Sequence, residues 1–170
     1  MALLQLATDK QVVLLRLGLL PQDQVAAACG PGRALARLLA SPSLLLAGVG
    51  VTQDCQLLHA QYGLSCRGVL ELAPVASELL GNRKGAGLRA LCRTILSKDL
   101  PKVYEIRCGD WLAQPLSDAA IEYAALDAEA GRLLLEALHE ESVRQAGREG
   151  GAGGLLGWAR AHARDVVERE

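Results

Sequence analysis

Two acidic residues stand where the sequence predicts functional side chains. Asp54 follows the apolar run Leu44–Val51, which is typical of a buried strand, and α/β domains bind ligands at the carboxyl ends of central strands. Asp127 lies one helical turn after Tyr123, so a carboxylate and a phenol share one face of a predicted helix. The alanines beside Asp127 leave room for another backbone or for a ligand. These three side chains are therefore the candidates for chemistry.

Each candidate carboxylate also has a purely structural interpretation. Asp54 falls in the first turn of a predicted helix, where the helix dipole favours an acid, and Asp127 also fits a solvated helix face. His59 and His139 have no ligand partner at metal-binding spacing. The sequence contains no GxSxG, Walker, GxGxxG or HExxH motif. The local patterns alone leave both interpretations open.

The composition is that of one globular domain. The chain has 170 residues, of which 51% are hydrophobic and 3% aromatic, enough for a single aliphatic core. Its formal net charge of −1 creates no field that would attract nucleic acid to the whole surface, so such contact needs a local patch. One set of basic residues could contact phosphates, and an ordinary solvated surface explains it equally well. This set comprises Arg83, Lys84, Lys98, Lys102 and Arg107.

The cysteines and the apolar start of the chain indicate a soluble, intracellular protein. Five cysteines, an odd number, lie far apart without a CxxC pair, which favours buried reduced thiols over zinc sites or disulfides. Asp9, Lys10 and Arg16 interrupt the apolar stretch 1–20, so this stretch does not match a signal peptide. No segment has the length and apolarity of a membrane span, and we expect no membrane partner.

The apolar patterns in the first half of the chain predict strands that alternate with helices. Ala2–Thr8 and Gln11–Leu17 indicate a hairpin, which the polar loop Pro21–Gly32 follows. Leu44–Val51 predicts a strand buried on both faces, and Thr52 is placed to cap the helix after it. These elements are those of an α/β sheet.

The second half completes the predicted domain. Arg67–Leu72 predicts another strand, residues 74–80 and 87–96 predict helices, and Ser117 is placed to cap a long helix. We expect three parts along the chain: a domain of residues 1–145, a Gly-rich linker of residues 146–154, and a C-terminal helix of residues 155–170.

Several blocks, taken in order, resemble the DEDDy 3′-5′ exonucleases, the group that contains ribonuclease D and the Werner-type exonuclease domain. The resemblance covers Ala2 to about Leu138, and the ordered set is far more specific than any single block. The blocks are Ala2–Ala7, Ala47–Val51 followed by Asp54, Ile106–Trp111, Pro115–Ser117 and Tyr123–Asp127.

This resemblance implies a fold and a mechanism. The fold would be α/β and ribonuclease H-like, a mixed sheet with flanking helices. Two Mg²⁺ or Mn²⁺ ions held by carboxylates would activate a water and stabilise the leaving 3′ oxygen, so that DNA or RNA is hydrolysed from a free 3′ end. By resemblance, Asp54 and Asp127 would be metal ligands, and Tyr123 would orient the attacking water.

One part of the family pattern has no counterpart in the sequence. The first motif, an Asp-x-Glu on the opening strand, would precede Ala2, and no acidic pair elsewhere replaces it. We therefore expect the family's N-terminal strand to be missing, sheet edges to be left unpaired, and activity to be impaired in this chain. A shortened product of a longer gene and an inactive relative both fit this pattern.

Two non-catalytic functions compete with the exonuclease hypothesis. The basic residues could bind nucleic acid without cutting it, and the predicted tail helix, residues 155–170, could bind a protein partner. Coding sequence upstream of Met1 separates these hypotheses, because an in-frame Asp-x-Glu strand there supports the enzyme.

Overall fold

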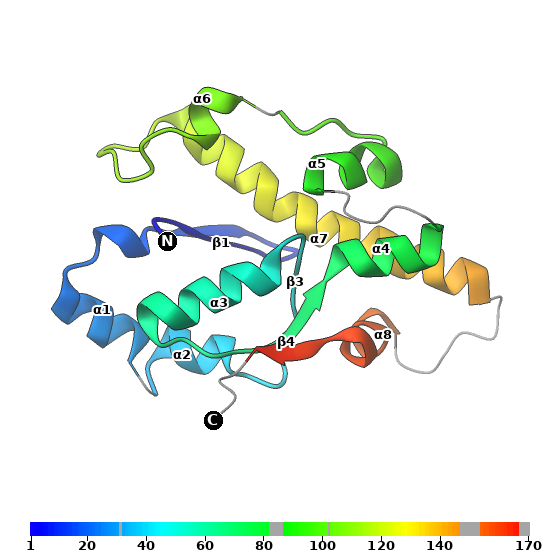
Figure 1. Cartoon of the computed structure of the whole chain (residues 1–170), viewed down its shortest axis with the longest axis horizontal. Coiled ribbons are helices and arrows are strands. Elements are labelled where there is room, and N and C mark those ends of the chain that lie inside the picture. The colour runs from blue at the N-terminus through cyan, green and yellow to red at the C-terminus, as the bar shows by residue number, and fades with distance from the viewer. Residues whose placement is uncertain (31, 82–86, 102, 147–153, 167–170) are drawn as a thin grey trace.

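The computed structural model describes residues 1–30, 32–81, 87–101, 103–146 and 154–166. It shows a mixed α/β domain, as the sequence predicts, in which the long helix α7 (Asp118–Ala146) packs against two small sheets (Figure 1). The other helices are α1 (Gln22–Cys29), α2 (Ala34–Leu39), α3 (Val51–Tyr62), α4 (Leu72–Leu80), α5 (Leu88–Leu91), α6 (Tyr104–Arg107) and α8 (Gly154–His162), with a 3₁₀ turn η1 (Leu17–Leu19) and a π-helical turn η2 (Cys92–Leu96).

The strands form two separate sheets. β1 (Leu4–Ala7) and β2 (Val12–Leu15) pair antiparallel in the hairpin that the sequence predicts. β3 (Leu46–Gly48) pairs in parallel with one edge of β4 (Cys66–Glu71), and β5 (Arg164–Val166) pairs antiparallel with the other edge. Within the described residues, β1 and β3 therefore each have one paired edge and one unpaired edge.

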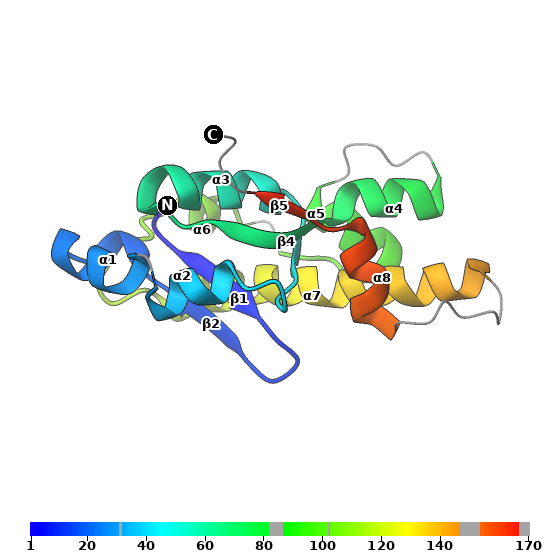
Figure 2. The ribbon, with the colours of Figure 1, turned by 90° about the horizontal axis from the view of Figure 1, so that it is seen from below.

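Two hydrophobic cores hold these elements together. In the first core, Leu134 and Leu138 of α7 are fully buried against Leu70 of β4, Leu72 of α4 and Leu91 of α5. Figure 2 shows α3 and α7 on opposite sides of β4, so the second core forms on the α3 side of the sheet. Its buried residues are Leu4, Leu17, Cys29, Leu39, Cys55, Leu58, Leu64, Cys66 and Val69.

Segment 21–32, predicted to be a loop, contains helix α1 instead. Pro21 precedes the helix and its carbonyl accepts a hydrogen bond from the N–H of Val25 at 2.8 Å. Alanine and glutamine residues have high helix propensity, and Asp23 in the first turn interacts favourably with the helix dipole. The loop prediction is wrong because these helix propensities outweigh the effect of the glycines and prolines at the ends of the segment.

Strand β3 is shorter than the predicted strand Leu44–Val51 and is only partly buried. It pairs on one edge alone, so neither edge is enclosed as in the interior of a parallel sheet. Thr52 does not cap the next helix, because α3 begins at Val51 and Gly50 occupies the N-cap position. The predicted cap of the long helix is confirmed, since the hydroxyl of Ser117 accepts a hydrogen bond from the N–H of Ala120 at 3.3 Å.

The C-terminal segment differs from the single helix predicted for residues 155–170. Helix α8 ends at His162, and β5 follows it and joins the edge of β4. Ala159 of α8 is fully buried in the first core, and the Arg160 guanidinium donates a hydrogen bond to the Ser43 carbonyl at 2.9 Å. The segment thus packs into the domain. Residues 147–153 of the predicted linker, and residues 167–170, lie outside the described residues.

Two further observations concern the chemical environment of the chain. All five cysteines are free thiols; Cys29, Cys55, Cys66 and Cys92 are buried, as the sequence predicts, whereas Cys108 is exposed. Among the described helices, none combines the length and the apolarity that crossing a membrane requires.

Replacing Leu134 with alanine will test the first core. Leu134 is 0% exposed, so Leu134→Ala should lower the free energy of unfolding by about 2–5 kcal/mol through lost burial and the cavity left behind. Urea denaturation at neutral pH measures this change. Val143→Ala is the matched control on the same helix, because Val143 is 45% exposed and should change the unfolding free energy by less than about 0.5 kcal/mol. Equal effects of the two variants would contradict this description of the core.

Candidate active site

A cavity of about 320 Å³ lies between the two sheets. Strand β1 lines one side, β3 and the first turns of α3 line the other, and α7 contributes a third wall. Asp54 reaches the cavity from α3, and Asp127 reaches it from α7. The structure therefore brings together two carboxylates that are distant in the sequence.

Glu71 fixes the start of helix α3 and thereby the position of Asp54. Its carboxylate, at the end of β4, accepts hydrogen bonds from the N–H groups of Gly50 at 2.6 Å and Thr52 at 3.4 Å. A carboxylate at this place satisfies amides that lack a partner within the helix and complements the helix dipole. Gly50 has φ of +82°, a left-handed conformation that glycine adopts without a steric penalty. The turn so formed directs Asp54 into the cavity.

Helix α7 approaches strand β3 closely at Gly131. A Cβ atom at this position would lie 3.7 Å from the Ala47 carbonyl oxygen and 3.8 Å from the Gly48 Cα atom. A larger side chain would therefore press on the backbone of β3. Because Asp127 lies one turn before Gly131 on α7, this close approach determines how near Asp127 comes to the β3 side of the cavity.

Burial changes the electrostatics of both candidate carboxylates. Burial raises the pKa of Asp127, and burial followed by repulsion from Glu71 raises the pKa of Asp54. The Asp54 residue is exposed to solvent, although it is one of the residues that line the cavity. The pKa of the Cys92 thiol is raised by burial and by Asp127. Carboxyl groups that line a cavity and have raised pKa values are typical of a functional site.

Tyr123 lies beside this cavity and not among the residues that line it. It occupies the turn of α7 before Asp127, and its ring centroid is 6.3 Å from that of Trp111 at an interplanar angle of 51°. Burial raises the pKa of the Tyr123 phenol, and Asp127 raises it further while Arg107 acts in the opposite direction. The phenol is thus protonated at neutral pH. It lies close enough to Asp127 for the charge of that carboxylate to raise the phenol pKa.

The basic residues of the sequence prediction are only partly described. Arg83, Lys84 and Lys102 lie outside the described residues. Arg107 is exposed on α6, with its guanidinium carbon 5.8 Å from the centroid of the Tyr104 ring. Lys98 is also exposed, beyond the end of η2.

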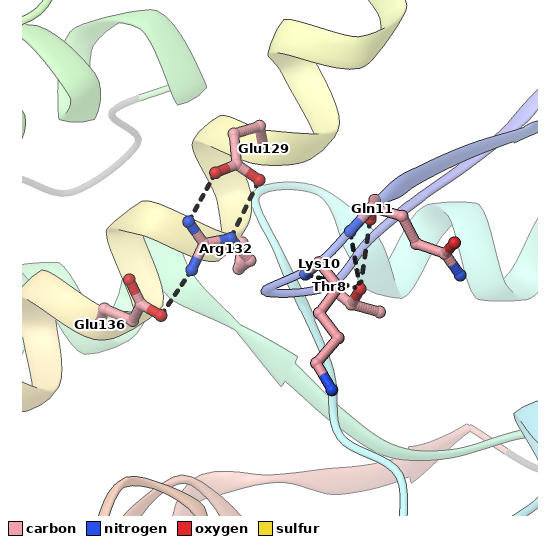
Figure 3. A network of polar contacts seen from close by, with 6 residues as sticks. All are labelled: Thr8, Lys10, Gln11, Glu129, Arg132 and Glu136. Carbon is pink, nitrogen blue, oxygen red and sulfur yellow. Dashed lines mark hydrogen bonds and ion pairs between the residues drawn. The ribbon is translucent and has the colours of Figure 1, made fainter.

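Two residues of the site were not identified in the sequence. The role of Glu71 has no sequence signal, because a hydrogen bond from the start of α3 to the end of β4 is not visible in local patterns. Arg132 lines the cavity and pairs with Glu129 at 2.5 Å and Glu136 at 2.5 Å, as Figure 3 shows. Their spacing of three and four residues along α7 is a sequence signal that could have been found. Because Arg132 is paired with these two glutamates, its positive charge does not offset the negative charge of Asp54 and Asp127.

The described residues contain no group of three or more Asp, Glu, His or Cys side chains positioned to hold a metal ion. Asp54 and Asp127 nevertheless offer carboxylate oxygens, which are the ligands that Mg²⁺ and Mn²⁺ prefer. The donor set therefore fits part of a site for a hard cation.

A scan against family models matches residues 1–142 to a family described as 3′-5′ exonuclease. A curated relative, the 3′-5′ exonuclease of Arabidopsis thaliana, is 34% identical over 111 residues, which are 65% of this chain and 38% of that protein. The chain thus spans well under half the length of this relative.

Two solved structures are also similar to the chain. One, described as the apo form of the nuclease, has a TM-score of 0.63 over 85% of this chain and 66% of that chain, at 23% identity. This is a likeness in fold. The EXD2 exonuclease domain soaked in Mn is 31% identical over 85% of this chain and 73% of that chain, with a TM-score of 0.38. The likeness to this second structure is one of sequence.

The raised pKa of Asp127 predicts that removing its charge increases the free energy of unfolding, by an amount that depends on pH. Because the folded-state pKa lies above the unfolded value near 3.8, the ionised carboxylate opposes folding at neutral pH and ceases to do so as acid protonates it. Asp127→Asn should raise the unfolding free energy at pH 7 by up to about 1 kcal/mol, and this gain should shrink as the pH falls towards 4.

Urea denaturation in EDTA across this pH range measures the effect. Asp118→Asn, at the exposed start of the same helix, is the control and should give no gain, since the helix dipole favours an acid there. A destabilised Asp127→Asn variant at pH 7 would contradict the electrostatic description of the cavity.

Proposed function

The chain belongs to the 3′-5′ exonuclease family, and from this membership we propose that it is a catalytic domain that shortens DNA or RNA from a free 3′ end. The observation that carries the proposal is that Asp54 and Asp127, from two different helices, line one cavity. Hydrolysis of a phosphodiester needs negative charge to be neutralised and a water to be positioned. A cation held by the cavity carboxylates would meet the first requirement, and Tyr123 beside the cavity suits the second.

We assign Asp54 and Asp127 as ligands of divalent cations, Mg²⁺ or Mn²⁺. Such cations, when bound, neutralise the charge that develops on the phosphate and lower the pKa of a water. The raised pKa values support this role, because burial disfavours the ionised form of both carboxylates, with repulsion from Glu71 adding to the effect at Asp54, and a bound cation would favour that form. A related exonuclease domain has been soaked in Mn, which is consistent with the same ion class.

We assign Tyr123 to orienting the attacking water. One helical turn, about 5.4 Å, separates it from Asp127, so its hydroxyl can reach the zone beside the carboxylate. Its raised pKa keeps the hydroxyl protonated, which suits donating a hydrogen bond and does not suit removing a proton. In this proposal Asp54 and Asp127 bind the cation, and Tyr123 positions the attacking water.

Two carboxylates cannot balance two dications, so the chain holds at most one such ion loosely. We propose that full activity requires two more carboxylates, on an Asp-x-Glu strand lying between the unpaired edges of β1 and β3. The cavity between these edges supports this location, because its walls are two strands with unused backbone hydrogen-bonding groups. Its apolar lining would bury the other face of such a strand.

A module that binds nucleic acid without cutting it is the second candidate function. One observation favours it, namely that the described residues offer no third metal ligand beside Asp54 and Asp127. Supplying the additional ligands separates the two functions, since only an enzyme would gain hydrolysis.

We also propose that the protein works in a reducing, intracellular compartment. The five free cysteines support this proposal, because an oxidising compartment would expose Cys108 to oxidation or intermolecular pairing.

A strand bearing Asp-x-Glu, joined through a short turn ahead of Ala2, should give metal-dependent 3′→5′ hydrolysis. The strand completes the ligand set and pairs with two open edges. Gel analysis of a 5′-labelled oligonucleotide with Mn²⁺ measures stepwise shortening. Asp127→Asn in this grafted chain should slow hydrolysis by more than the 10–100-fold typical of losing an outer-shell partner.

The matched control carries Asn-x-Gln in the same strand, which restores the sheet without the charges. It should fold and remain inactive. Calorimetry on the chain without the strand should detect at most one weak Mn²⁺ site. Two tight sites there, or intact oligonucleotide after incubation with a folded, metal-binding grafted chain, would refute the proposed function.

Tyr123→Phe in the grafted chain tests the positioning role. The ring and its packing against Trp111 remain, so the free energy of unfolding should stay the same. The hydrolysis rate should fall on the order of 10²-fold, because the hydroxyl that orients the water is gone. A variant with unchanged stability and unchanged rate would show that Tyr123 is only a core aromatic.

A further inference from the structure

Three of the five Trp and Tyr residues gather around α6 and the start of α7. Tyr104 lies on α6, Trp111 on the loop after it, and Tyr123 on α7. Together with Arg107 of α6 they form a set that we call the aromatic strip. Only Tyr123 of this set has a role in the proposed reaction.

Tyr104 presents its ring to solvent. It is 65% exposed, more than any other large hydrophobic residue recorded as exposed in the described part of the chain. Its neighbour Val103 is 38% exposed, and Ile121 on α7 is 43% exposed. A chain so poor in aromatic residues gains no core stability from a ring in this position, which points to a role in recognition.

Arg107 keeps its charge available beside the Tyr104 ring. Its guanidinium carbon lies 5.8 Å from the ring centroid. Arg89 and Arg132, in contrast, are bound by the carboxylates of Asp99 and Glu129. A cation next to an exposed aromatic ring combines the two features that single-stranded nucleic acid requires, a surface for stacking a base and a charge for a phosphate.

The aromatic strip leads from Tyr104 towards the cavity. The Arg107 carbonyl accepts a hydrogen bond from the Trp111 indole at 3.2 Å, and the Trp111 ring contacts Tyr123. The charge of Arg107 also reaches Tyr123, since it acts to lower the pKa of that phenol. Tyr123 in turn lies one helical turn from Asp127, which lines the cavity.

The loop that carries Trp111 is anchored to the hairpin side of the domain. The Arg16 guanidinium donates hydrogen bonds to the carbonyls of Trp111, at 3.4 Å, and Ala113. Asp110 accepts a hydrogen bond from the N–H of Leu112 at 2.8 Å. The Trp111 part of the aromatic strip is therefore held by the fold and needs little ordering on binding.

We propose that the aromatic strip binds the single-stranded 3′ segment of a nucleic acid, with a base stacked on Tyr104 and an adjoining phosphate paired with Arg107. This inference rests on the proposed function and names the surface that delivers the strand to Asp54 and Asp127. Stacking on a side chain requires an unpaired base, so the surface selects a single strand over a duplex. Every base has a flat face, so binding tolerates any sequence.

Fluorescence anisotropy of the 170-residue chain tests the proposal. The probe is a 5′-fluorescein, mixed-sequence, single-stranded DNA oligonucleotide of about 12 nucleotides, in EDTA so that no hydrolysis occurs. Tyr104→Ala should raise the Kd about 5- to 150-fold, the loss expected for one stacked base. Tyr104→Phe, which keeps the stacking face, should stay within about twofold of the unchanged chain.

Two matched substitutions separate stacking from other contacts. Tyr104→Leu should weaken binding as Tyr104→Ala does, since leucine is apolar but cannot stack. Leu57→Ala, at a residue that is 46% exposed on α3, should leave the Kd unchanged. Arg107→Gln should weaken binding and reduce the dependence of log K on log salt by about 0.7, the value for one phosphate contact to a single strand.

The proposal is overturned if the chain does not bind the oligonucleotide, or if Tyr104→Ala binds as tightly as the unchanged chain. Full binding by Tyr104→Leu would also overturn it, because it would show that the oligonucleotide does not need a stacking ring at this position. Binding is measured here without hydrolysis, so these outcomes are independent of the grafted-strand experiment. An inactive grafted chain that still binds through Tyr104 would refute the exonuclease proposal alone.

Discussion

Helix α7 packs against β1 and β2 on one side of the cavity and against β3 on the other, and the remaining structure depends on this arrangement. Its buried leucines, Leu134 and Leu138, complete the first core, while Gly131 lets the helix approach β3 closely. Two sheets that share no hydrogen bond in the described residues are thus held at a fixed separation by side-chain packing. The cavity exists because one helix supports both of its strand-lined walls.

Electrostatics at the cavity oppose the packing that creates it. The fold partly desolvates Asp54 and Asp127 and places Glu71 close enough to repel Asp54, so the metal-free domain carries unfavourable charge at neutral pH. Arg132 does not relieve this charge, because Glu129 and Glu136 already bind it. Glu71 is retained for another reason, since it holds the start of α3 through two amide hydrogen bonds. A cation in the cavity would interact favourably with these carboxylates and would therefore stabilise the folded domain that binds it.

Most elements determined by local patterns were predicted from the sequence, with α1 as the exception, and elements determined by distant partners were predicted less well. The hairpin, α3 and the capped start of α7 follow from apolar spacing and turn residues. The extent of β3 and the pairing of β5 depend on which strands lie alongside, which no local window contains. The positions of Asp54 and Asp127 after a predicted strand and on a predicted helix made them candidates, and the family resemblance suggested their roles, whereas Glu71 acts across the sheet and leaves no local signal.

Strand β5 covers an edge of β4 that would otherwise be open. Cys66 pairs with Val166 across this edge, so the contact joins segments that are made at very different times during translation. Until residues 164–166 have emerged, β4 presents unpaired amide and carbonyl groups, and the nascent domain is most exposed to wrong pairing with other chains. Because the strands of this pair lie far apart in the sequence, closing it costs more chain entropy than closing the hairpin of β1 and β2.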